Sequence, residues 1–219
     1  MPEKTSWDLP APVIKNDAFD VVNKGSGSGD FLRSVRMFSS STEAAKQGLI
    51  SPGNWGEYES KEELIDHGPT VDVLPLDRRL KAVDFEARIT TYNYDSEMFQ
   101  DIMAAANDAD RSTSYGTSFL VYLRDRGYRE VFFSSASSRE KSKDLAAYLP
   151  REGLPPEVVT LGSTYKKSKK FSWHVPTVAP CSVPIELPDQ VGLLAEIEKF
   201  REPSPDDADL IADNSNRVR

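Results

Sequence analysis

The chain has 219 residues, of which 38% are hydrophobic and 28% charged, and its formal net charge is −8 at neutral pH. This length allows one sizeable domain or two small ones, and the acidic balance excludes a generally basic nucleic-acid coat. Cys181 is the only cysteine, which excludes an intramolecular disulfide and a cysteine-based zinc site. No apolar run has the length of a signal peptide or membrane helix, so we expect a soluble, cytoplasmic protein with no membrane partner.

The two ends of the chain differ in composition from its middle. Residues 1–30 contain several prolines and the run KGSGSGD (residues 24–30), so we expect a flexible N-terminal arm. That run lacks the Gly-Lys-Ser/Thr of a phosphate-binding loop. Residues 203–219 are polar and acidic, which predicts a disordered tail. Residues 31–202 then form a single domain.

Strand-like and helical patterns alternate through the first half of this domain. Residues 31–38, 55–59, 71–85 and 87–94 are predicted strands, residues 40–47 are a predicted short helix, and residues 61–66 are read as polar, with a break at Gly68-Pro69. Because proline has no N–H to donate, we expect an edge strand or a bulge at Pro75. A further helix is predicted from a cap at Asp95 or Ser96 to Asn107, with its apolar residues on one face.

The second half begins with a hairpin. Residues 117–123 and 128–134 are joined by a turn that ends at Gly127, and apolar residues on both faces of the first strand predict a central position in a sheet. A helix follows over residues 137–149, opened by capping-box spacing. A final amphipathic helix is predicted to begin at Pro188 and Asp189.

Between these two helices lies a long predicted hairpin. Its strand-like runs are residues 158–161 and 171–179, and its tip carries Lys166, Lys167, Lys169 and Lys170 beside Tyr165, Phe171 and Trp173. A basic hairpin with aromatic rings fits a single strand, because bases stack on rings and phosphates attract lysine. The alternative is a solvated ribbon whose aromatic residues belong to the core.

This order of elements predicts an α+β protein that is mainly β. We expect an OB-like barrel or a curved antiparallel sheet, with a helix before the long C-terminal hairpin and a C-terminal helix.

Motifs of catalysis are not found in the sequence. His67 and His174 are far apart and neither belongs to an HExxH motif, while Cys181 is read as a small buried residue. No G-x-S-x-G elbow is present and the carboxylates do not pair as in two-metal nucleases. We therefore expect no enzyme, no cofactor and no metal.

Three basic groups remain as a candidate binding surface. They are Arg33 and Arg36; Arg78, Arg79 and Lys81; and Lys166 to Lys170, with Tyr92, Tyr94 and Tyr122 as further aromatic neighbours. If a barrel closes, some of these groups converge on one concave face.

Three stretches carry a resemblance to a known class. DVLPLDRRLKAVDF (residues 72–85), YGTSFLVYL (115–123) and KKFSWHVPTVAPCSVPI (169–185) resemble phage-encoded single-stranded DNA-binding proteins, which place an OB-type barrel before an acidic tail. The resemblance implies support of replication or recombination in the host cytoplasm. It assigns DNA binding to Lys166, Lys167, Lys169, Lys170, Phe171, Trp173 and the group Arg78, Arg79 and Lys81. The C-terminus departs from bacterial single-strand binders, because it ends in Arg217-Val218-Arg219.

Other functions stay open at this point. The acidic tail can compete for the basic face or dock replication and recombination proteins, and the protein can form oligomers. One alternative is a phage structural or assembly protein whose arm and tail contact neighbouring subunits. Another is an enzyme of nucleotide or small-molecule chemistry that uses carboxylates the sequence does not group.

Overall fold

The computed structural model describes residues 32–60, 63–87, 89–108, 112–151, 156–169, 172–183 and 189–201, and the structural statements below concern these residues. The expected N-terminal arm and acidic tail lie outside them. None of the described helices is long and apolar enough to cross a membrane.

The described strands form two antiparallel sheets. The larger sheet has the order β7-β6-β4-β8-β9, with β5 also paired to β4, and the smaller has the order β1-β2-β3. The strands of the larger sheet are β4 (Val71–Asp84), β5 (Ile89–Thr91), β6 (Thr113–Leu123), β7 (Gly127–Ser134), β8 (Val159–Lys167) and β9 (Ser172–Pro180). Those of the smaller sheet are β1 (Arg36–Met37), β2 (Trp55–Tyr58) and β3 (Leu64–Gly68). The helices are α1 (Glu43–Lys46), α2 (Glu97–Asn107), α3 (Ser135–Ala146) and α4 (Gln190–Arg201).

Strand β4 is the centre of the larger sheet. One of its edges pairs with β6 from Leu74 to Asp84, while its other edge pairs with β8 at Val71–Val73 and with β5 further along. Pro75 has no N–H to donate, so an edge position or a bulge was expected there. The structure has the bulge, because the register to β6 shifts between Pro75 and Asp77.

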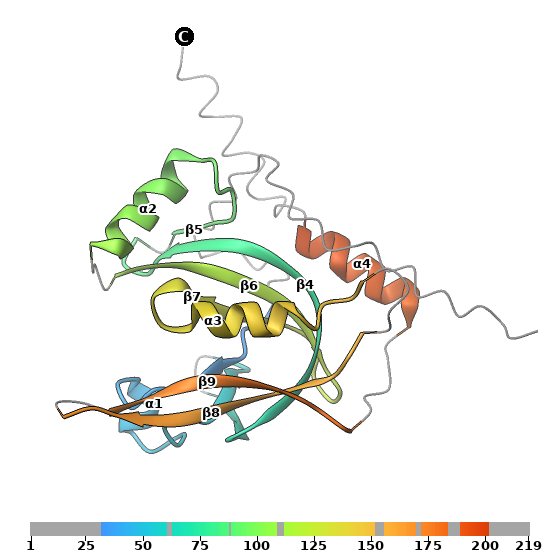
Figure 1. The fold of residues 1–219 in the computed structure, drawn as a ribbon, viewed down its shortest axis with the longest axis horizontal. Coiled ribbons are helices and arrows are strands. Elements are labelled where there is room, and N and C mark those ends of the chain that lie inside the picture. Colours follow the sequence, from blue (N-terminus) through green and yellow to red (C-terminus); the bar gives the residue numbers. More distant parts are fainter. Residues whose placement is uncertain are drawn as a thin grey trace, which may run out of the picture.

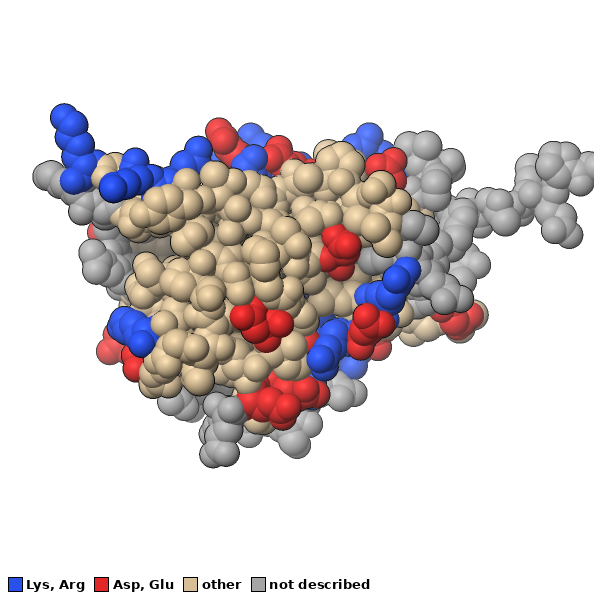
Figure 2. Space-filling view, turned by 90° about the horizontal axis from the view of Figure 1, so that it is seen from below, with Lys and Arg blue, Asp and Glu red and all other residues tan. Residues whose placement is uncertain are grey.

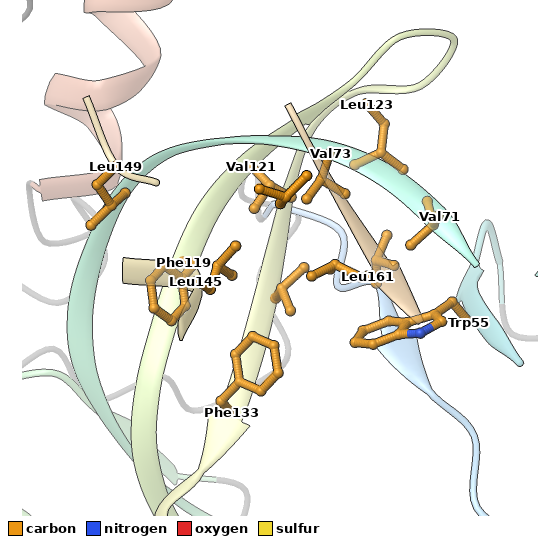
Figure 3. Close-up of a cluster of buried hydrophobic side chains, with 13 residues drawn as sticks. Trp55, Val71, Val73, Phe119, Val121, Leu123, Phe133, Leu145, Leu149 and Leu161 are labelled. Atoms are coloured by element: carbon orange, nitrogen blue, oxygen red, sulfur yellow. The ribbon is translucent and has the colours of Figure 1, made fainter. Parts of the chain in front are cut away.

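Helices cover both faces of the arch that β4, β6 and β7 form (Figure 1). Under the arch, Phe119 and Val121 of β6 pack with Leu145 of α3 and with Leu161 of β8, and Figure 3 shows these side chains pointing toward one another. On the outer face, Leu120 packs with residues of α4. The two-faced apolar pattern of β6 therefore predicted its central position correctly.

The coarse expectation for the fold is confirmed. The protein is α+β with a curved, mostly antiparallel sheet, a helix before the long hairpin and a C-terminal helix. The described strands do not close into a barrel, because β7 and β9 end the strand order without pairing with each other. A strand was not expected within the polar residues 61–66, but Leu64 begins β3 there and packs against the cluster of Phe38 and Ile50.

We predict that Phe119→Ala lowers the free energy of unfolding by about 3–5 kcal/mol, because Phe119 is fully buried under the arch. Phe85→Ala is the matched control, since 60% of Phe85 is exposed, and should cost less than about 1 kcal/mol. Urea denaturation of both variants measures the difference. Equal losses would show that the arch does not hold the main core.

Candidate nucleic-acid interface

The β8–β9 hairpin carries exposed lysines and no carboxylates of its own. The sequence from Val158 to Ile185 contains no Asp or Glu. The described lysines Lys166, Lys167 and Lys169 are exposed near its tip, which extends past the rest of the body (Figure 1). Seen from the hairpin side, the surface is mostly uncharged, and several Lys and Arg side chains gather at its upper left margin (Figure 2). This hairpin remains the leading candidate interface.

The register of the hairpin separates its two described aromatic residues. Tyr165 pairs with His174, and Lys166 pairs with Trp173. Cross-strand partners lie on the same face of a sheet and neighbours along a strand lie on opposite faces. Tyr165 and Trp173, which are 56% and 40% exposed, therefore lie on opposite faces. Lys167 shares the face of Tyr165, while Lys166 shares that of Trp173.

One face of the hairpin is supported by the loop before β2. The rings of Tyr165 and His174 lie 5.3 Å apart between centroids. His174 in turn covers Gly53, where an added Cβ would lie 2.5 Å from His174 Cδ2. Gly53 also has a positive φ of 90°, so this close approach requires glycine on both steric and backbone grounds. This contact holds the smaller sheet against the hairpin.

Arg79, from the second predicted basic group, is enclosed by the protein's own groups. Its guanidinium Cζ lies 3.5 Å from the ring centroid of Tyr92 and 4.2 Å from that of Phe200. Its Nη1 donates a hydrogen bond of 2.5 Å to the carbonyl oxygen of Phe200. Arg201 reaches the same region and donates from Nε to Asp77 Oδ2 at 2.5 Å. These contacts fasten the end of α4 to β4.

Lys81 lies on the same face of β4 and is paired inside the protein. Its Nζ lies 2.7 Å from Glu130 Oε2, and Ser118 Oγ donates to Glu130 Oε1 at 2.5 Å. Burial by itself lowers the pKa of Lys81, but the Glu130 carboxylate outweighs burial and the pKa is raised. Burial likewise acts to raise the pKa of Glu130, and Lys81 and Arg79 outweigh it, so that pKa is lowered. Both groups are therefore charged in the folded protein.

The three predicted basic groups do not converge. Arg78 lies half-buried on the opposite face of β4, across from Phe119. Arg33 pairs with Glu59 at 3.0 Å, and Arg36 stacks on the rings of Phe38 and Tyr58. Because β8 runs antiparallel to β4 at Val71–Val73, the two strands leave this pairing in opposite directions, and β4 then curves into the arch that lies above the hairpin (Figure 1). The predicted site residues Lys170 and Phe171 lie outside the described residues.

A buried ionic cluster that the sequence analysis missed lies between β2, β3 and β7. Glu57 is fully buried, and Arg129 donates to it from Nε and, at 3.4 Å, from Nη2. His67 Nε2 lies 3.6 Å from Glu57 Oε1 and has no hydrogen-bond partner among the described residues. The pKa of His67 is lowered, chiefly because burial disfavours its charged form. A carboxylate flanked by Gly56 and Tyr58 in a predicted strand was the signal available in the sequence.

Other kinds of site find little support in the described part of the chain. It holds no group of three or more His, Cys, Asp or Glu residues that could bind a metal ion. Cys181, expected to be buried, is half-buried. No protein-family model, curated protein or solved structure matches the chain.

We predict that Lys81→Met lowers the free energy of unfolding by about 3–5 kcal/mol, because it leaves the buried Glu130 carboxylate without its cation. The double variant Lys81→Met/Glu130→Leu should regain most of this loss, since it removes both buried charges. Thermal and urea unfolding of both variants test the pair. If Lys81→Met alone lowers the free energy of unfolding by less than about 1 kcal/mol, Lys81 does not act as the internal partner of Glu130.

We predict that His67 makes the protein less stable in mild acid. Its pKa is lowered from 6.5 on folding, so the unfolded chain binds the proton first as the pH falls. Stability is then lost from about pH 6.5 down to the lower pKa of the folded state. His67→Gln should therefore lose less stability than the parent between about pH 7.5 and about pH 5.5 in urea titrations. Parallel losses in the two proteins would contradict this assignment.

Proposed function

We propose that this protein binds single-stranded nucleic acid, with DNA as the first candidate, through the β8–β9 hairpin and without catalysing a reaction. The observation that carries the proposal is the joint exposure of three lysines and two aromatic rings on a hairpin that contains no carboxylate. Rings offer stacking surfaces to bases of any sequence, and lysines offer charge to phosphates. Binding of this kind tolerates many sequences.

The acidic character of the whole chain does not prevent such binding. Screening limits charge effects between exposed groups to roughly 8–10 Å at physiological salt. A strand at the hairpin tip is therefore influenced mainly by Lys166, Lys167 and Lys169. Arg79 and Lys81 of β4 are held by Tyr92, the end of α4 and Glu130, so they support the fold in this proposal instead of the DNA contact.

The biological role that we propose rests on the layout of the chain. A β-rich body followed by an acidic C-terminal sequence is the layout of the phage single-stranded DNA-binding proteins that the chain resembles. That likeness favours a role in replication or recombination. An OB-type classification would need a closed barrel, which the described strands do not form, so the proposal rests on the hairpin and not on a barrel type.

We predict salt-dependent binding of an oligo-dT strand by the full chain, measured by fluorescence anisotropy between about 50 and 200 mM salt. Lys166→Gln/Lys167→Gln should weaken binding at every salt concentration. It should also reduce the slope of log K against log salt by about 0.7, because the two lysines lie on opposite faces and one bound strand loses one phosphate contact.

Lys46→Gln/Lys143→Gln is the matched control. It removes the same charge from two exposed lysines outside the hairpin and should leave the slope unchanged. Equal effects of the two double variants would show that only net charge matters and would contradict a hairpin site. Absence of binding at low salt would overturn the proposed function. Concentration-dependent oligomers in such a protein would then support the assembly alternative.

A further inference from the structure

The two faces of the hairpin carry matching sets of groups. One face holds Tyr165 and Lys167 on β8, and the other holds Lys166 opposite Trp173. Each face therefore has one exposed ring and one exposed lysine. Neighbours two positions apart on a strand lie about 7 Å from each other, and cross-strand partners lie closer still. Each set is thus compact enough to contact one nucleotide, the ring meeting the base and the lysine a phosphate.

A single linear strand cannot use both sets at once. Side chains on opposite faces of a two-stranded ribbon point away from each other. A strand that follows one face reaches Tyr165 or Trp173, but reaching both requires it to turn around the tip. Two strands that diverge on either side of the ribbon reach both rings without bending. The arrangement therefore fits two separated strands better than one.

We propose that the hairpin binds at a junction between duplex and single strands, with its tip between the two diverging strands and one unpaired base stacked on each face. This inference rests on the proposed function, because it requires the hairpin to bind nucleic acid. Lys169, exposed near the turn, adds positive charge where the two phosphate backbones approach each other.

The composition of the hairpin favours open bases over an intact duplex. A two-stranded ribbon can enter the major groove, where Arg, Lys, Asn and Gln read base edges by paired hydrogen bonds. Residues 159–180 contain no Arg, Asn or Gln, so lysine is the only one of these four residue types that the hairpin offers. Aromatic rings contribute most to binding where bases are unstacked and can lie against the ring. The first unpaired bases at a junction are in this state.

The test compares three labelled DNAs of equal total nucleotide number, namely a forked duplex, a single strand and a blunt duplex, by anisotropy with the full chain. We expect the fork to bind more tightly than either of the other two. A 2-aminopurine base placed in the first unpaired position of either arm of the fork should report a change of stacking on binding. Equal affinity for fork and single strand would overturn the junction proposal but leave the proposed function intact. Tightest binding to the blunt duplex would overturn the junction and favour the groove.

Variants separate the two faces. Tyr165→Ala and Trp173→Ala should each weaken fork binding by about 5- to 150-fold, because each removes one stacked base. On the single strand each should cost no more than about twofold, since the other face remains available. Phe85→Ala is the control, because Phe85 is 60% exposed but directly follows β4, away from the hairpin, and it should change neither affinity.

The variant data also distinguish failure of the junction proposal alone from failure of the proposed function. If one ring variant weakens fork binding and the other does not, only one face is used and the junction proposal is wrong. If no DNA is bound by the parent protein, the proposed function and the junction fail together. Circular dichroism of each variant confirms that the fold is kept, which is expected because both rings are exposed.

Discussion

The structure depends on one strand that is hydrogen-bonded along both of its edges. β4 joins β6 on one side to β8 and β5 on the other, so every strand of the larger sheet is connected through it. Its bulge between Pro75 and Asp77 lies where the proline has no N–H to donate to the ladder, and a bulge increases the local twist. The arch that results has two faces, and each must be covered by apolar side chains from elsewhere in the chain (Figure 1).

Covering both faces also determines the state of the charges on β4. The outer face carries Asp77, Arg79 and Lys81 under or beside α4, where water is largely excluded. A buried charge is tolerated only with a partner, and here Arg201, the end of α4 and Glu130 supply the partners. A basic cluster that looks like a nucleic-acid surface in sequence thereby becomes part of the domain's interior. The exposed lysines of the hairpin, in contrast, lie in a segment that contains no Asp or Glu.

Local patterns in the sequence predicted the local structure well. Ser96 caps α2 as expected, since its Oγ accepts from the N–H of Phe99 at 3.1 Å, and the alternation along β6 predicted its two apolar faces. What failed depends on contacts between distant residues. Arg79 meets Phe200, which is 121 positions away, and the pairing of Lys81 with Glu130 depends on three strands lying side by side. No spacing along the chain contains that information.

In the candidate site, too, the sequence predicts the kinds of residues present but not their arrangement in space. Composition alone marks the hairpin as basic and aromatic, but which face each ring occupies depends on the pairing register. A slip of one residue would place Tyr165 opposite Trp173 and bring both rings to one face. Val159 and Leu161 prevent that slip because both are fully buried in the main core, and Gly162 allows close approach to Thr177 across the strands. The packing at the base of the hairpin therefore fixes the chemistry presented at its tip.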